Sequence, residues 1–174
     1  MKKVLTFAIA VAVASALGVG VSMAKVNGST PTVRALGDET FEVNALIQAT
    51  FRFSPMVIDV PSGGTLRFIK QDNAPDEPHT LSIVSQGQLP TDVEGVFNCG
   101  ACNRILDEHF GGSTPKLRVD PDGDGGLDTP GDSILILPGV NNSISQTVTA
   151  PPGTTLHFMC AIHPWMQGEI KVTG

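Results

Sequence analysis

Two parts of the chain alternate apolar and polar residues on both sides of a turn that contains proline and glycine. The first covers residues 51–60, turns at 61–64 and continues at 65–69, where Leu66 and Phe68 share one face. A period of two residues is typical of a half-buried β-strand, because successive side chains of a strand point to opposite faces. The alternation therefore predicts antiparallel β structure and constrains the chain to an all-β fold.

The second part has the same design near the C-terminus. Strands are expected at 144–149, 154–160 and 168–172, with a proline- and glycine-containing turn after the first. Within 154–160, Cys160 has the same parity as Phe158. A core-facing Phe158 therefore brings Cys160 to the inner side, at the point where the strand ends.

The composition narrows the classes of protein that this chain can belong to. Its 174 residues, 41% hydrophobic and 16% charged, suit one domain with an ordinary core. The 19 glycines and 13 prolines have no fixed period, which excludes helical repeats, coiled coil and collagen. A net charge of -6 without a cluster of lysine and arginine excludes nucleic acid as a partner.

The N-terminus has the pattern of a secretory signal peptide over residues 1–24. Lys2 and Lys3 precede an apolar run, and the small residues Ser22 and Ala24 fit the signal-peptidase site. Cleavage after Ala24 predicts an exported protein, periplasmic or extracellular, in an oxidising compartment. The alternative is an uncleaved anchor, which would bring the protein to a membrane.

The remaining chain divides into a short lead-in and one domain. Residues 25–40 are polar and without a period, so a flexible lead-in is expected. Residues 41–174 form the domain, with an insertion at about 86–133 that holds a Cys-x2-Cys pair, a helix-compatible run at 103–109 and an acidic loop. A connection of this length is uncommon unless it carries function or its own small structure. We therefore expect a long loop with a short helix, inserted into a β-sandwich.

Cys99 and Cys102 in the insertion allow three interpretations. The C-x2-C spacing serves disulfide exchange, metal binding and structural bridging alike. Export favours a Cys99–Cys102 disulfide, which leaves Cys160 as the single thiol. A second metal or redox site that recruits His109, or a pair of free thiols, remains the alternative.

The acidic loop that follows resembles the first part of a calcium-binding loop. Acidic residues stand at its first, third and fifth positions, followed by glycine, but position 12 is Gly131 instead of the bidentate glutamate. Asp128 and Asp132 are near enough to replace it. A solvated acidic turn is the alternative. The candidate calcium ligands are Asp120, Asp122, Asp124 and Asp128.

The strongest motif is Cys160-x2-His163-x2-Met166, directly after a predicted strand. It places a thiolate, an imidazole and a thioether in one short loop. Two histidines and one cysteine in a plane, with a weak axial methionine, form the blue-copper electron-transfer site. His79, at the start of another apolar strand, can supply the second imidazole.

The other two histidines fit this site less well. His157 has the opposite parity to Cys160 in its strand, and His109 lies in the insertion. Taken singly, a histidine before a strand, a methionine near the C-terminus and a lone cysteine have ordinary structural explanations. Their combination at this spacing favours a metal site.

These residues make the chain resemble the cupredoxin, or type 1 blue copper, family, with the loop length of its plastocyanin- and amicyanin-like members. The resemblance covers about residues 51–84 and 144–173. It implies a Greek-key β-sandwich with one copper ion, and the insertion lies outside the family core. Many members have asparagine where this chain has Thr80, so the hydrogen bond that the asparagine makes between loops is not carried over. The implied ligands are His79, Cys160 and His163 in the plane and Met166 on the axis.

The resemblance implies a one-electron carrier and not an enzyme. Protein side chains fill all four ligand positions, and the chain is too short for the further copper domains of a multicopper oxidase. His163 is followed by Pro164 and Trp165, so redox partners are expected to dock near His163 and Trp165. A monomer is expected.

Two other functions remain as alternatives. A copper chaperone or storage protein is the first, although Met56, Met159 and Met166 alone remain after the signal peptide, whereas Cu(I) trafficking favours clusters of thioethers. A thiol–disulfide oxidoreductase is the second. It would use Cys99 and Cys102 and would act independently of Cys160.

Overall fold

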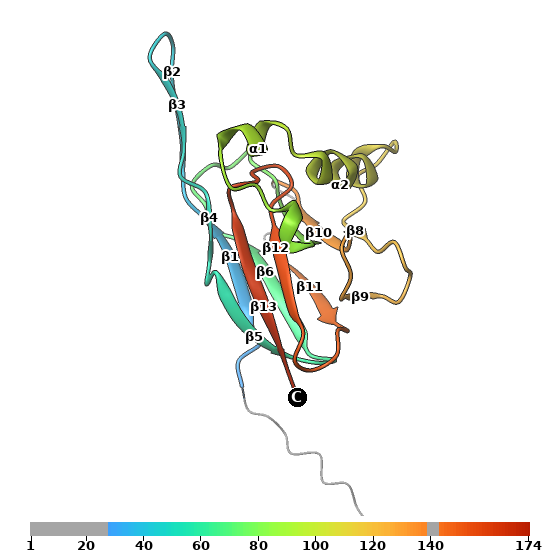
Figure 1. The fold of residues 1–174 in the computed structure, drawn as a ribbon. Helices are drawn as coiled ribbons and strands as arrows, with labels where there is room; N and C mark the ends of the chain where they lie inside the picture. The colour runs from blue at the N-terminus through green and yellow to red at the C-terminus, as the bar shows by residue number, and fades with distance from the viewer. Residues whose placement is uncertain (1–27, 139–142) are drawn as a thin grey trace, which may run out of the picture.

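The computed structural model describes residues 28–138 and 143–174, and the predicted signal peptide at 1–24 lies outside them. Figure 1 shows strands along the length of the molecule and two helices near one end. Within the described residues, no helix has the length and apolar character needed to cross a membrane.

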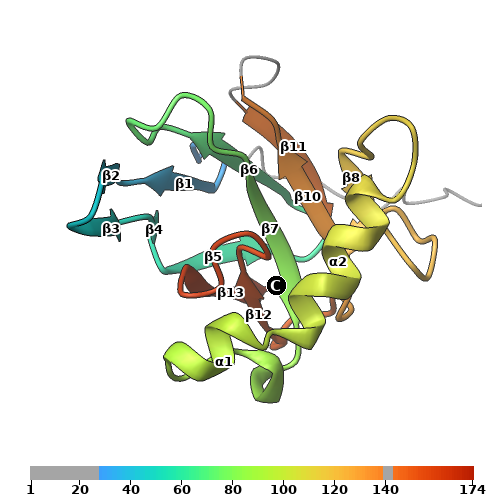
Figure 2. The same ribbon diagram turned by 90° about the horizontal axis from the view of Figure 1, so that it is seen from above.

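Two sheets pack face to face as the layers of a β-sandwich (Figure 2). The first has the strand order β4-β1-β6-β11-β9 and the second β5-β13-β12-β7-β10-β8. The strands of the first sheet are β4 (Arg52–Ser54), β1 (Thr32–Leu36), β6 (Thr65–Lys70), β11 (Ser143–Val148) and β9 (Gly126–Leu127). Those of the second are β5 (Val57–Pro61), β13 (Gln167–Thr173), β12 (Thr155–Met159), β7 (His79–Val84), β10 (Ser133–Ile136) and β8 (Arg118–Val119).

The core lies between these sheets and is organised by aromatic rings. Phe53 contacts Phe68 of the first sheet and Phe158 of the second, with ring centroids 5.9 and 5.0 Å apart. All three rings are buried, as is Leu66, whereas Thr65 is exposed. The predicted alternation and the all-β sandwich are thus confirmed.

The structure departs from the flexible lead-in expected at 25–40, because β1 lies inside the first sheet. β1 pairs in parallel with β6 and antiparallel with β4. Val33 and Ala35 are fully buried. Their alternation spans only five residues beside a polar stretch, which made the strand hard to recognise. β13 and β5 also pair in parallel, so the sheets are mixed and not purely antiparallel.

The insertion contains more regular structure than the predicted short helix. A 3₁₀ helix spans Gln86–Gln88, α1 spans Val93–Phe97 and α2 spans Gly100–Phe110. Asp92 caps α1 by accepting a hydrogen bond from the Gly95 N–H at 2.7 Å. α2 packs against the outer side of the second sheet, where its Cys102 and Ile105 side chains cluster with Val84 of β7 and Met159 of β12.

A separate hairpin of β2 (Glu39–Glu42) and β3 (Leu46–Ala49) projects away from the sandwich (Figure 1). Its Phe41 and Ile47 side chains are exposed.

The pairing of β12 with β7 determines where the candidate site lies. The strands are antiparallel, with Met159 opposite Ser82. The end of β12 therefore meets the beginning of β7. This register brings Cys160, which follows β12, beside the first residues of β7.

Gly168 offers a test of this packing. A Cβ at this position of β13 would overlap the ring of Phe158 and the carbonyl oxygen of Met56. Overpacking of a core commonly costs about 1–3 kcal/mol. We expect Gly168→Ala to lower the free energy of unfolding by this amount in chemical denaturation. Gly87→Ala is the control, since a Cβ there meets nothing within 4 Å. Equal stability of both variants would contradict this packing.

Candidate metal centre

Three side chains from separate parts of the sequence converge at one end of the sandwich. The Sγ of Cys160 lies 3.9 Å from Nδ1 of His79 and 3.7 Å from Nδ1 of His163. One ligand atom from each residue lies within 4.8 Å of the others. His79 and Cys160 are fully buried, and His163 is 7% exposed. The structure thus brings together three of the four predicted copper ligands.

The loop after β12 folds back on itself and places its side chains. The Cys160 N–H donates to the Met166 carbonyl at 3.0 Å, and the Met166 N–H donates to the His163 carbonyl at 2.8 Å. These two hydrogen bonds hold His163 beside the sulfur. Met166, the predicted axial ligand, is 1% exposed and belongs to the same core cluster as Cys160.

His79 is oriented by a buried carboxylate that sequence reasoning missed. Its Nε2 lies 3.1 Å from Oδ2 of Asp72. Because a carboxylate accepts hydrogen bonds, the ring proton belongs on Nε2 and the lone pair of Nδ1 faces the sulfur. Asp72 is itself held by the Lys70 ammonium at 2.6 Å. A metal-binding histidine commonly has such a partner on its second nitrogen.

His163 has the equivalent arrangement nearer the surface. Its Nε2 lies 3.3 Å from Oε2 of Glu77, which leaves Nδ1 facing Cys160. The ring packs between Phe51 and Trp165, with centroid distances of 4.7 and 5.3 Å. Trp165 is fixed in turn, because its indole N–H donates to the Phe51 carbonyl at 3.1 Å.

Burial determines the protonation states of these groups. Desolvation lowers the pKa of His79 to about 4, with a further lowering by His163, and desolvation lowers the pKa of His163 to about 4. Both imidazoles are therefore neutral at neutral pH, with lone pairs available to a metal. Burial raises the pKa of the Cys160 thiol, so metal binding there must release a proton.

Thr80 forms a hydrogen bond between the loops, which the resemblance left open because many family members have asparagine at this position. Its hydroxyl oxygen accepts a hydrogen bond from the Ala161 N–H at 2.7 Å, and its own N–H donates to Cys160 Sγ at 3.4 Å. A threonine hydroxyl thus joins the His79 strand to the Cys160 loop.

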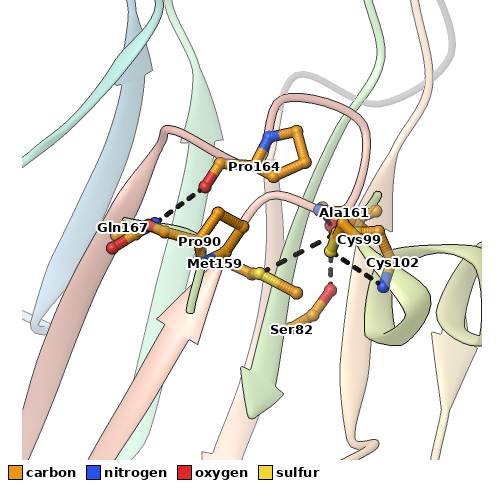
Figure 3. Close-up of a disulfide and its surroundings, with 9 residues drawn as sticks. Ser82, Pro90, Cys99, Cys102, Met159, Ala161, Pro164 and Gln167 are labelled. Carbon is orange, nitrogen blue, oxygen red and sulfur yellow. Dashed lines mark hydrogen bonds between the residues drawn. A yellow bond between two sulfur atoms is a disulfide. The ribbon is translucent and has the colours of Figure 1, made fainter. Parts of the chain in front are cut away.

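The insertion packs directly on the strand that leads to Cys160. Cys99 and Cys102 form the predicted disulfide, with Cα atoms 5.2 Å apart. Figure 3 shows this disulfide beside Met159, whose sulfur lies 4.0 Å from that of Cys102. On the other side, the Gln167 amide donates to the carbonyls of Pro90 and Pro164 at 2.8 and 2.9 Å (Figure 3). The insertion, which the resemblance leaves outside the family core, therefore contacts the strand and the loop that carry the candidate ligands.

The acidic loop gains no support as a calcium site. Carboxylate oxygens of Asp120, Asp122 and Asp124 do lie within 4.8 Å of one another. However, both oxygens of Asp120 accept backbone hydrogen bonds, from Gly123 at 2.8 Å and from Gly125 at 2.7 Å. These bonds account for the cluster as a turn. Burial and the neighbouring Asp124 raise the pKa of Asp128 to about 6.

His157 and His109, which fit the metal site less well in the sequence, lie outside it in the structure. His157 on β12 lies 3.6 Å from Glu169. His109 is buried against Ser133, with Nε2 and Oγ 2.7 Å apart.

The chemistry of the donor atoms restricts which metals the site can hold. Two neutral imidazoles and one thiol match zinc and copper and not calcium or magnesium, which prefer oxygen. Met166, the predicted fourth ligand, is buried in the same core cluster as Cys160, and a thioether donor favours copper. These residues therefore fit a copper ion.

Comparisons with known proteins found distant similarity to solved structures of cupredoxins. No family model and no curated protein matches the sequence. Among solved structures, auracyanin B is 24% identical with a TM-score of 0.44, covering 84% of this chain and 93% of its own. A purple cupredoxin from Nitrosopumilus maritimus is 12% identical with a TM-score of 0.43, covering 82% and 99%. Since these likenesses are distant and concern the fold alone, the assignment of the site depends on its geometry.

Asp72 offers a test of how the site is held. We expect Asp72→Asn to weaken metal binding about 10–100-fold, the usual effect of losing a hydrogen-bond partner of a ligand histidine. A competition titration with a chromophoric chelator measures the affinity. Asp76→Asn is the control, because Asp76 is exposed and close in sequence. If both variants bind equally well, Asp72 does not orient His79.

The lowered pKa values predict how the metal-free protein responds to acid. His79 and His163 have a folded pKa of about 4 against 6.5 for a free histidine, so the unfolded chain binds more protons between these values. Their contribution to stability is complete above pH 6.5 and is lost as the pH falls towards 4.

Denaturant unfolding at several pH values, compared with a His79→Gln/His163→Gln double variant, measures this contribution. The comparison cancels the opposite effect of Asp128, whose raised pKa is unchanged in the variant. Parallel stability curves for the two proteins would contradict neutral, buried histidines.

Proposed function

We propose that this chain is a mononuclear type 1 copper protein that carries single electrons between redox partners. The observation that carries the proposal is the buried convergence of two neutral histidine Nδ1 atoms and one cysteine sulfur. When bound, the ion supplies a one-electron couple between Cu(I) and Cu(II). His79, Cys160, His163 and Met166 would hold the ion.

The surrounding residues support a rigid site. Asp72 and Glu77 hold the two imidazoles through their Nε2 atoms, while Thr80 joins the two loops. Such outer hydrogen bonds restrict movement of the ligand side chains. A carrier benefits from this rigidity, because little needs to rearrange when the charge of the site changes.

The burial of the ligands supports a carrier over an enzyme. His79 and Cys160 are inaccessible to solvent, and the His163 side chain is 9% exposed. Among the described residues, the Cys160 sulfur is covered and offers no surface to a substrate. An electron can still leave through the imidazole edge of His163, which is the ligand nearest the surface.

We further propose that redox partners dock beside His163. Trp165, whose ring is 5.3 Å from that of His163, is 43% exposed. Next to it, Val93 and Phe97 of α1 are exposed, and a groove of about 550 Å³ runs between Trp165 and this helix. Apolar surface at the exit of the electron is suited to brief contact with a partner. The signal-like N-terminus supports an exported protein, periplasmic or extracellular.

The chaperone alternative has less support. Met56 is exposed on the surface, and Met159 is buried against the disulfide. This arrangement leaves Met166 as the one thioether in the Cys160 cluster of the core. A site with two imidazoles also suits both copper oxidation states, whereas Cu(I) trafficking favours sulfur ligands.

Spectroscopy of the copper-loaded protein tests the proposed function. We expect an intense visible thiolate-to-Cu(II) band and a small parallel hyperfine splitting in electron paramagnetic resonance. Cys160→Ser should abolish the band, and His79→Ala should abolish or alter it. Met166→Leu should stay coloured with a higher reduction potential, since an axial donor favours Cu(II). His157→Ala is the control and should keep the spectrum. A coloured Cys160→Ser protein would contradict the site.

A further inference from the structure

A continuous chain of buried polar side chains connects the insertion to the candidate copper site. It begins at His109 on α2, whose Nε2 is 2.7 Å from the Ser133 hydroxyl on β10. The Ser133 oxygen is 2.7 Å from that of Ser82 on β7, and Ser82 donates to Thr80 Oγ1 at 2.8 Å. Thr80 lies beside Cys160.

Because these side chains are buried, each of them needs a hydrogen-bond partner within the protein. His109, Ser133, Ser82 and Thr80 are all 0% exposed. A buried polar group that lacks its hydrogen bond costs about 1–3 kcal/mol, so such groups are normally satisfied within the protein. The hydrogens must therefore be arranged so that each short contact contains one.

The charge of His109 determines how the hydrogens of the three hydroxyl groups are arranged. Its Nδ1 lies 2.6 Å from the Lys116 carbonyl, which can only accept, so Nδ1 carries a hydrogen. With Ser82 donating to Thr80, Ser133 has one hydrogen for two short contacts, to Ser82 and to His109. A cationic His109 supplies the missing hydrogen from Nε2, and every contact is then satisfied.

With a neutral His109, the chain can be satisfied only in the reverse direction. Ser133 then donates to His109 Nε2, Ser82 donates to Ser133, and Thr80 must donate to Ser82. The Thr80 hydroxyl hydrogen is thereby withdrawn from the neighbourhood of Cys160. When His109 is cationic and Ser82 donates to Thr80, the Thr80 hydroxyl hydrogen is free to reach the sulfur. Although burial raises the pKa of Cys160 overall, hydrogen bonds from the Thr80 backbone and side chain lower it.

We propose that His109 is a positioning residue for the copper site: acting through Ser133 and Ser82, it sets whether the Thr80 hydroxyl donates a hydrogen bond to the Cys160 sulfur. The proposal rests on the proposed function. A hydrogen bond to the thiolate withdraws electron density from sulfur and stabilises the reduced site, so protonation of His109 raises the reduction potential.

The charged groups around His109 are few. Burial is the largest influence and lowers the pKa of His109, the hydrogen bond to the Lys116 carbonyl raises it, the charge of the Lys116 side chain lowers it, and Glu108 on the same helix raises it. Arg118 on β8 is engaged with Gln146 and the Ser145 carbonyl. Asp132, just before β10, accepts the Asp128 and Thr129 N–H groups. No charged side chain in this described region pairs directly with the His109 ring.

Voltammetry of the copper-loaded protein against pH tests the effect on the site. The reduction potential of the wild type should rise as the pH falls through the titration of His109, and His109→Gln should lose that step. Ser133→Ala keeps the imidazole but removes a hydroxyl that links His109 to Ser82, so it should reduce the pH-dependent rise of the reduction potential. Thr80→Ser keeps the hydroxyl and should retain the step, as should the control His157→Gln. An undiminished step in Ser133→Ala would leave only the distant charge of His109 and would overturn the proposal.

Nitrogen-15 NMR of the metal-free protein gives a second test that does not require copper. Coupling is reciprocal, so Thr80→Val should shift the pH at which the His109 ring titrates, whereas Thr80→Ser and the control Ser143→Ala should not. A His109 that titrates identically in Thr80→Val, or that stays neutral over the whole range in which the protein is folded, would overturn the proposal. If copper does not bind, the proposed function fails, but this measurement still shows whether His109 is coupled to Thr80 through the buried hydroxyls.

Discussion

The antiparallel pairing of β7 with β12 is the constraint on which the rest of the site depends. It brings His79, which begins one strand, beside Cys160, which follows the other, although 81 residues separate them. His163 is brought beside the sulfur locally, since the loop after Cys160 folds back through two backbone hydrogen bonds. One strand register therefore joins a local motif to a distant ligand.

Burying these ligands has a cost that the surrounding hydrogen bonds offset. An imidazole placed in a core loses its hydration, which is why the pKa values of both histidines are lowered to about 4. Asp72 accepts the ring hydrogen of His79, and the Glu77 carboxylate lies 3.3 Å from Nε2 of His163. These carboxylates also fix which nitrogen faces the sulfur. The same bonds that compensate for burial thus prepare the donor atoms for a metal.

The strands and the spacing of the candidate ligands could be predicted from the sequence, because both are local patterns. Alternation of Leu66 and Phe68 marks a buried face within a few residues, and the Cys160–Met166 loop carries three donors in sequence. β1 was missed because its alternation is short and polar residues surround it. Asp72 was missed for a different reason: nothing in its neighbourhood indicates that it is buried against His79. Contacts made by folding leave no periodic signal.

The role of the insertion could not be read from sequence for the same physical reason, and it changes how the site should be understood. α2 lies over the second sheet, and the Cys99–Cys102 disulfide packs on Met159 immediately before Cys160. Buried hydroxyls of β7 and β10 face the insertion, and His109 meets them there. An apolar sheet face would pack against α2 without such groups. The presence of serines at these buried positions indicates that the two strands and the helix are matched in hydrogen bonding as well as in shape, so a substitution in the insertion can act on the metal loop without touching a ligand.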